Sequence, residues 1–162
     1  MRVYLGSDHA GFELKAALLE HLRGLGHDPV DCGALTFEPS DDYPGPCIAT
    51  AQRVMAEPGT LGVVIGGSGN GEQIAANKVP GVRAALVWNR ATAELARQHN
   101  DANVVSIGAR QHSVDEATEL VLLFLRTDFS GDERHVRRIG LVTDYERDRR
   151  RPAGGLPTRT EI

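Results

Sequence analysis

The sequence predicts one α/β domain. A five-stranded parallel sheet with helices on both faces, a Rossmann-like or flavodoxin-like three-layer sandwich, is followed by an extra C-terminal helix. Short apolar segments alternate with segments of helical periodicity, and one short segment, 61–65, is apolar throughout, as in a strand covered on both faces. A chain of 162 residues suits a single domain. We expect that domain to span 1–148, and 149–162 to form a disordered tail without periodicity.

The expected strands are 2–6, 29–32, 61–65, 83–88 and 104–107. After the first strand, Leu14, Leu18 and Leu22 recur at helical spacing, and Gly24 and Gly26 mark the end of that helix. A loop rich in Asp and Pro is expected over 36–46, before a second helix over about 47–56. The pattern therefore gives the order of a parallel sheet with crossover helices.

Further helices are expected after the third, fourth and fifth strands. One follows the glycine-rich segment 66–71, one spans about 90–99, and one opens with a capping box formed by Ser113 and Glu116. A last helix over about 131–147 has no strand after it, yet it carries apolar residues that must be buried somewhere. We expect it to be an arm that packs on another subunit.

The composition excludes several classes of protein. The chain has 18 basic and 22 acidic residues, so no basic excess points to a nucleic-acid partner. The longest apolar run, 120–125, is far short of the roughly 20 residues that cross a bilayer. Asp8 and His9 interrupt the apolar start before a signal peptide could form. Two cysteines, Cys32 and Cys47, lack metal-ligand spacing. We expect a soluble cytoplasmic protein with no membrane partner, no disulfide framework and no structural zinc.

The segment from Gly66 to Gly71 is the strongest local signal. It holds four glycines in six positions, with Ser68 and Asn70 between them. Ligands bind outside the carboxyl ends of parallel strands, and successive amides at the start of a helix bind anions. The segment is not a P-loop, because Glu72 follows where that motif has Lys, and it does not fit the dinucleotide pattern. We favour an anion or oxyanion site over a bare turn.

Each of the other candidate residues, at strand ends and helix ends, could instead have a role only in stabilising the local fold. Asp8 could cap a helix, and Glu72 could simply stabilise the helix dipole. His99 ends a predicted helix, where histidine often only satisfies the last carbonyl groups. Arg134 and Arg138 are four residues apart and therefore share a helix face.

Together these motifs resemble the ribose-5-phosphate isomerase B family, which includes the galactose-6-phosphate isomerase subunits. The matching segments cover about 1–147 and are Gly6-Ser7-Asp8-His9-Ala10-Gly11-Phe12, Asp31-Cys32-Gly33, Asp42-Tyr43-Pro44, the run from Gly66 to Lys78, His99-Asn100, Ile107-Gly108-Ala109-Arg110 and the run from Arg134 to Ile139. The resemblance implies interconversion of ribose 5-phosphate and ribulose 5-phosphate through a cis-enediolate, without a metal or other cofactor.

The resemblance also implies the roles of the site residues. Many members have a cysteine base at the position of Gly66; this chain instead resembles a branch, typical of actinobacteria, in which the glutamate at Glu72 is the base. Glu72 would then move the proton between C2 and C1, and His99 would open the sugar ring. The enediolate would be held by the Ser68 hydroxyl and the loop Gly67, Gly69, Asn70 and Gly71. Further substrate contacts would come from Asp8, His9, Asn100 and Arg110, and the phosphate would be bound by Arg134 and Arg138.

In the resembled family the site lies at a dimer interface, with the histidine and the arginines supplied by the neighbouring chain. We therefore expect a homodimer with shared active sites, and two dimers can pair further into a tetramer. A hexose 6-phosphate isomerase, acting on allose or galactose 6-phosphate, remains an alternative. So does a non-catalytic sugar-phosphate binding module, which would need neither Glu72 nor His99. A nucleotide-binding domain is disfavoured because both phosphate-loop patterns fail.

Overall fold

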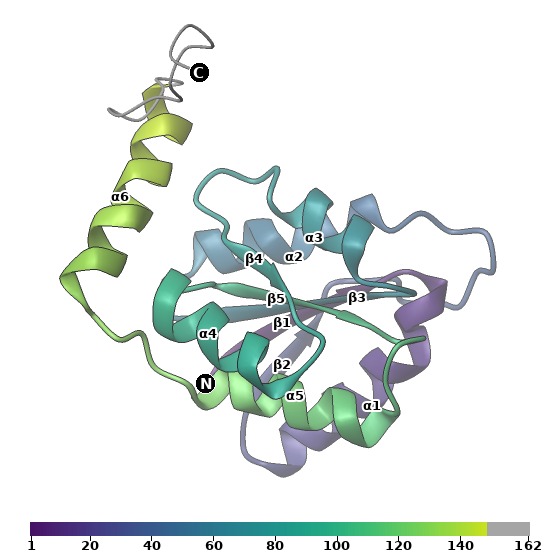
Figure 1. The fold of residues 1–162 in the computed structure, drawn as a ribbon. Helices are drawn as coiled ribbons and strands as arrows, with labels where there is room; N and C mark the ends of the chain where they lie inside the picture. Colours follow the sequence, from purple (N-terminus) through teal and green to yellow (C-terminus); the bar gives the residue numbers. More distant parts are fainter. Residues whose placement is uncertain (149–162) are drawn as a thin grey trace, which may run out of the picture.

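A computed structural model describes residues 1–148 and shows a parallel five-stranded sheet (Figure 1). The strands are β1 (Arg2–Ser7), β2 (Asp28–Asp31), β3 (Leu61–Gly66), β4 (Ala84–Leu86) and β5 (Val104–Gly108). Their order is β2-β1-β3-β5-β4, and every neighbouring pair is parallel. The predicted fold class is therefore confirmed. The predicted tail, 149–162, lies outside the described residues.

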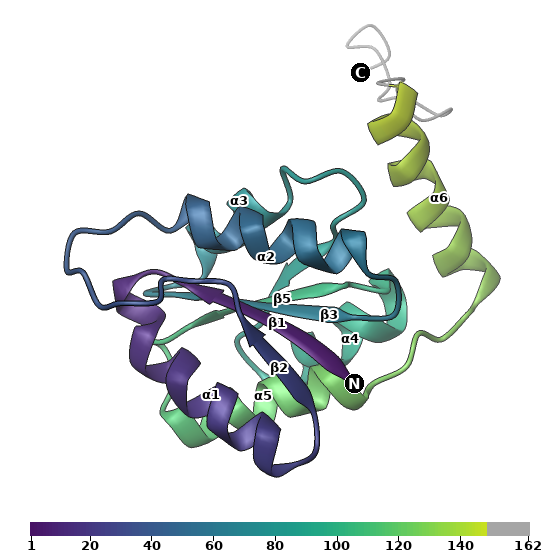
Figure 2. The ribbon, with the colours of Figure 1, turned by 180° about the vertical axis from the view of Figure 1, so that it is seen from behind.

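Helices cover both faces of this sheet and bury one core on each side. They are α1 (Phe12–Gly24), α2 (Pro44–Ala56), α3 (Asn70–Ala76), α4 (Arg90–Asn100), α5 (Val114–Arg126) and α6 (Glu133–Asp148), with a 3-10 turn, η1, over His9–Gly11. Helices α2 and α3 lie on one face, and α1, α4 and α5 lie on the other (Figures 1 and 2). The strands thus end at a common edge, where loops and helix starts meet.

Most elements differ from their expected ranges by one or two residues at an end, and α2 and β4 differ most in length. Helix α2 begins at Pro44, earlier than expected, because Pro fits the first helical turn, where no N–H is needed. Strand β4 is shorter than 83–88, because side chains bind the backbone on either side of it: the Arg83 N–H donates to Asn103 Oδ1 at 2.8 Å, and the Trp88 N–H donates to Thr92 Oγ1 at 3.2 Å. The expected capping box of Ser113 and Glu116 is confirmed at α5.

Helix α6 stands away from the sheet after a connecting segment and contacts α4 (Figures 1 and 2). Its residues Val136, Val142 and Tyr145 are exposed, so the apolar side predicted to need a partner is uncovered in this chain. Glu146 Oε2 accepts the Gly81 N–H at 2.8 Å, which ties the helix to the loop before β4. Within residues 1–148, no helix combines the length and the apolar character that crossing a membrane requires.

Candidate active site

A pocket of about 390 Å³ opens at the carboxyl edge of the sheet, beyond β1, β3 and β5. The structure brings together seven of the residues expected in the site: Asp8, His9, Gly67, Ser68, Gly71, Glu72 and Arg110. Three further residues also line it: Ala10, Tyr43 and Gln111. The strand-end rule therefore located the pocket, while Tyr43 comes from a loop to which no role was given.

Glu72 is the buried carboxylate of this pocket. It is the third residue of α3, and only 4% of its surface is exposed. Its carboxylate lies against Gly66, so that a Cβ at position 66 would overlap Oε1. Gly66 thus leaves the space in which the Glu72 carboxylate sits. The two positions are spatially exclusive, because a side chain at 66 and the carboxylate of 72 cannot share one volume.

The surroundings of Glu72 favour its neutral form. Burial is the main cause that raises the pKa of Glu72, and the negative charge of Asp8 raises it further, while backbone hydrogen bonds at Glu72 and Gly69 act in the opposite direction. Burial likewise raises the pKa of the Cys47 thiol, with smaller effects from Glu72 and Asp8. Cys47 therefore stays a neutral thiol beside the carboxylate, and Glu72 has a pKa closer to neutrality than that of a solvated glutamate.

The glycine-rich loop that leads to Glu72 is fixed by β5. Gly69 has a φ of +82°, which favours glycine, and its carbonyl accepts a hydrogen bond from Ser106 Oγ at 2.7 Å. The carbonyl of Gly66 accepts the Ala109 N–H at 2.8 Å, and that of Gly67 accepts the Arg110 N–H at 3.1 Å. The loop is thus held on both sides of Ser68, which is exposed and lines the pocket.

The side chain of Asp8 both caps the turn η1 and lines the pocket. Its Oδ1 accepts the N–H groups of Ala10 at 3.0 Å and of Gly11 at 3.2 Å, so the capping alternative is confirmed. The same side chain also lines the pocket that contains Glu72. Because Asp8 is buried, its negative charge acts directly on the neighbouring carboxylate.

Most of the other expected site residues lie away from this pocket, near α4 and α6. His99, Asn100 and Arg138 line a groove of about 710 Å³ between β4, α4 and α6. Arg134, exposed at the start of α6, lies 3.7 Å from Asp132. None of these side chains lines the Glu72 pocket of this chain. Gly69 and Asn70 do not line it either, since Gly69 is buried under Leu86 and Asn70 borders an adjoining pocket. One chain therefore divides the expected site into two separate groups.

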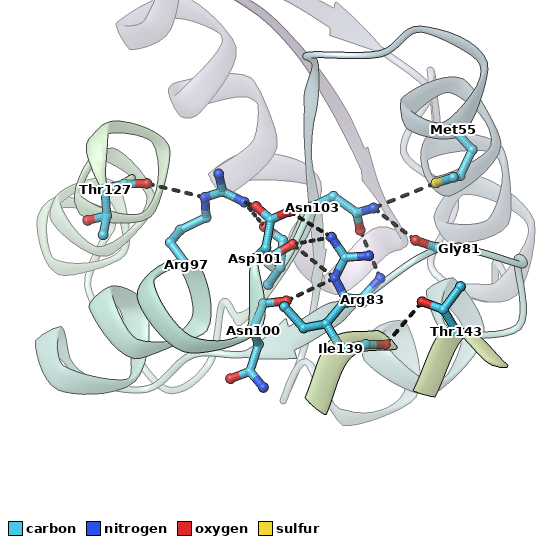
Figure 3. Close-up of polar contacts among 11 residues, drawn as sticks. Met55, Gly81, Arg83, Arg97, Asn100, Asp101, Asn103, Thr127, Ile139 and Thr143 are labelled. Carbon is cyan, nitrogen blue, oxygen red and sulfur yellow. Dashed lines mark hydrogen bonds and ion pairs between the residues drawn. The ribbon is translucent and has the colours of Figure 1, made fainter. Parts of the chain in front are cut away.

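His99 is not needed to satisfy the end of α4. Arg83 donates to the carbonyl of Asn100 at 2.9 Å and to that of Asp101 at 2.7 Å, and Arg97 donates to the carbonyl of Ala102 at 2.7 Å (Figure 3). The two arginines therefore bind these carbonyls, and the role of His99 stays a prediction.

The imidazole of His99 packs instead on His135, with ring centroids 4.2 Å apart. His135 Nδ1 lies 2.8 Å from Ser130 Oγ. Burial, followed by the neighbouring His99, lowers the pKa of His135, so this buried ring favours its neutral form.

Comparison with known proteins shows the family of the whole chain. The family model described as Ribose/Galactose Isomerase matches residues 3–142. The chain is 57% identical to ribose-5-phosphate isomerase B of Mycobacterium tuberculosis over 152 residues, which cover 94% of each protein. The chain belongs to the ribose/galactose isomerase family. The resemblance seen in its motifs, to ribose-5-phosphate isomerase B, is thereby confirmed.

Solved structures of ribose-5-phosphate isomerases B share the fold of this family member. The enzyme of Clostridium thermocellum superposes with a TM-score of 0.87 at 38% identity, covering 93% of this chain and 100% of that one. That of Mycoplasma genitalium with bound ribulose-5-phosphate gives a TM-score of 0.87 at 40% identity, covering 91% and 97%. The identity is spread over nearly the whole length of the proteins, so the likeness extends beyond the sheet.

Within residues 1–148 of this isomerase, one group of side chains has the spacing of a metal site: Asp8, His9 and Asp41. One side-chain atom of each residue in this group already takes part in a hydrogen bond. Asp8 Oδ1 accepts two backbone N–H groups, and Asp41 Oδ1 accepts the His9 N–H and lies 2.8 Å from His9 Nδ1. The arrangement is thus explained by capping and by one Asp–His pair.

Sequence reasoning gave no role to Ala10 and Gln111, each next to an expected pocket residue, or to Tyr43 and Asp41 in the loop before α2. Tyr43 belongs to a segment that carried the family resemblance, and its ring lies over Gly71, where a Cβ would meet Cζ at 2.7 Å. Asp41, two residues earlier, contacts His9. Apart from that resemblance, the sequence signal was the density of Asp and Pro in 36–46, which indicates a loop but not where the loop folds back.

Proposed function

We propose that this isomerase interconverts D-ribose 5-phosphate and D-ribulose 5-phosphate through a cis-enediolate, with Glu72 as the proton-transferring base. The observation that carries the proposal is the buried Glu72 carboxylate, which fills the space left by Gly66 at the carboxyl edge of the sheet. The relative from Mycoplasma genitalium, whose structure contains ribulose-5-phosphate, supports a pentose phosphate as the substrate.

The chemistry requires one base and donors for a developing oxyanion. Glu72 removes the proton from C2 of the open-chain aldose as the carbonyl electrons move to O1. The same carboxyl then returns that proton to C1 of the enediolate, the electrons at O2 form the C2 carbonyl, and the O2 hydroxyl proton passes to O1. Ser68 and the amides of its loop stabilise the oxygens of that intermediate. Asp8 and His9 bind sugar hydroxyls, while Arg110 contributes a positive charge at the same pocket.

Ring opening and phosphate binding require the second group of residues. His99, Asn100, Arg134 and Arg138 lie apart from Glu72 within one chain, so a complete site needs a second copy to bring its groove to the pocket. The uncovered apolar residues of α6 support such pairing. We therefore include a homodimer with shared sites in the proposal, with His99 protonating the ring oxygen and the arginines binding the phosphate. Two dimers can pair into a tetramer.

The deciding experiment is turnover of ribose 5-phosphate by the purified protein in EDTA, beside allose 6-phosphate and galactose 6-phosphate. We expect pentose turnover that is unaffected by the chelator. Turnover of a hexose phosphate alone would replace the substrate in the proposal. Binding of the sugar phosphates without turnover of any of them would show a binding module and overturn the enzymatic function.

The pH profile of kcat follows from the environment of Glu72. Burial raises the pKa of Glu72 above the usual 4.5 for glutamate, and only the ionised form can accept a proton. We expect kcat to fall on the acidic side with a midpoint above 4.5. The measurement should use kcat rather than kcat/KM, because the phosphate of the free substrate itself titrates near a pKa of about 6. A midpoint at or below 4.5 would contradict a buried base.

Substitution of Val142 by Asp tests the dimer. Val142 is 62% exposed on α6, so the change should leave the fold stable, with a free energy of unfolding within about 0.5 kcal/mol of the original. A carboxylate on the apolar side should instead prevent pairing, and we expect a monomer in sedimentation velocity that has lost turnover. Val142→Ile is the matched control, since it keeps an apolar side chain at the same exposed position, and it should keep both pairing and turnover. An active monomer would contradict the shared site.

A further inference from the structure

Asp41 and His9 form a pair at the edge of the proposed active site. Asp41 Oδ1 accepts the backbone N–H of His9 at 2.8 Å and also lies 2.8 Å from His9 Nδ1. Both side chains are mostly buried, with exposed fractions of 18% for Asp41 and 29% for His9. One carboxylate oxygen thus holds the imidazole through the main chain and through the ring.

The geometry specifies which ring nitrogen carries the hydrogen. The carboxylate oxygen is an acceptor, and it already accepts the backbone N–H of His9, so Nδ1 must be the donor in the second contact. Nε2 is then the ring nitrogen that remains for a ligand, and in the neutral ring it is an acceptor. His9 lines the pocket that contains Glu72, so this acceptor belongs to the substrate site.

The loop that carries Asp41 is held in position by a hydrogen bond and an aromatic contact. The Asp41 N–H donates to the Glu38 carbonyl at 3.1 Å, and the ring of Phe37 packs edge-on against Phe12 with centroids 5.9 Å apart. Two residues after Asp41, Tyr43 enters the pocket wall. The position of the carboxylate is therefore determined by the loop, and His9 is oriented by a residue outside its own turn.

We propose that Asp41 is a positioning residue of the isomerase: it holds His9 as the Nδ1–H tautomer, so that Nε2 accepts a hydrogen bond from a hydroxyl group of the sugar phosphate. This role rests on the proposed function for its substrate, whereas the tautomer itself is a property of the free protein. Asp41 acts through His9 and takes no proton from the substrate.

Kinetics of Asp41→Ala test the role in substrate binding. Without the carboxylate the ring can rotate and change tautomer, and we expect KM to rise about tenfold or more, as for loss of a hydrogen bond to a charged group, with a smaller change in kcat. In a His9→Ala background the same substitution should have no further effect on KM. Asp42→Ala is the matched control, because Asp42 is adjacent and exposed, and its KM should equal that of the original protein.

Asp41→Asn provides a second variant of the same volume. Its amide oxygen can still accept from the His9 backbone, so we expect a smaller rise in KM than for Asp41→Ala. A rise in KM that persists in the His9→Ala background, or an equal rise in Asp42→Ala, would show a general effect on the loop and overturn the proposal.

Two-bond ¹H–¹⁵N correlation spectra of the histidine rings report the tautomer without any turnover. The His9→Ala spectrum assigns the His9 signal among the six histidines. We expect Nδ1–H for His9 in the original protein and a shift toward Nε2–H in Asp41→Ala. An Nε2–H ring in the original protein would overturn the proposal. If the tautomer is as expected but ribose 5-phosphate is not turned over, the proposed function is wrong, while the assignment of the His9 tautomer to its contact with Asp41 still holds.

Discussion

Glu72→Gln is expected to lower kcat by about 10²–10⁴-fold, the range typical of removing a general base. Glutamine has nearly the shape of glutamate, so the space beside Gly66 stays filled, but an amide cannot accept the C2 proton. The protein should still bind phosphate esters, because the proposed phosphate ligands Arg134 and Arg138 are unchanged and lie outside the Glu72 pocket of their own chain. Steady-state turnover of ribose 5-phosphate, with KM measured separately, checks this result. Turnover close to that of the original protein would remove Glu72 from the mechanism.

The same substitution has an expected effect on stability, which separates loss of chemistry from loss of fold. Because burial raises the pKa of Glu72 in the folded protein, the unfolded chain ionises first as pH rises above 4.5. Folding stability therefore decreases from that pH through the folded pKa, as the buried carboxyl is forced to ionise. Glu72→Gln is free of this cost, so its free energy of unfolding should exceed that of the original at pH 7. In urea titrations, the two should converge near pH 4.

The fold was predictable because the chain alternates short apolar segments with amphipathic ones from β1 to α5. Segment 61–65 could be assigned to a strand buried on both faces, and it became β3 at the centre of the sheet. The ends of elements were less predictable, because they depend on contacts between distant residues. Strand β4 begins only after Arg83, whose N–H donates to the side chain of Asn103 in a distant turn, and periodicity does not describe this contact.

The site was predictable only as far as strand ends determine it. Asp8, His9, the glycine loop and Arg110 follow strands directly, so the order of strands brings them to one edge. Asp41 and Tyr43 follow no strand, and the fold-back of their loop is a tertiary event with no periodic signal. Sequence spacing also gave no measure of the separation between His99 and Glu72 within one chain, which depends on where α4 and α6 lie relative to the sheet.

Gly66→Ala is expected to lower kcat by about a hundredfold while leaving every polar group of the site in the chain. A Cβ at position 66 would overlap the Glu72 carboxylate, so that carboxylate has to move. A displacement of about 1 Å in a reacting group can cost about 10² in rate. The fold should tolerate the change, since the group that yields is the end of a flexible side chain. Turnover of ribose 5-phosphate and urea unfolding of the same preparation check both parts.

Gly62→Ala is the matched control, four residues earlier in β3. A Cβ there would meet Val54 Cγ2 at 2.9 Å and Val104 Cγ2 at 3.1 Å, in the apolar core and away from the pocket. Overpacking of this kind costs about 1–3 kcal/mol of stability. We therefore expect each substitution to affect a different quantity. Gly62→Ala should lower the free energy of unfolding with near-normal kcat, and Gly66→Ala should lower kcat with little change in the free energy of unfolding. If Gly66→Ala kept full activity, the carboxylate could act from another position. The claim that Glu72 needs the space beside Gly66 for catalysis would then be wrong.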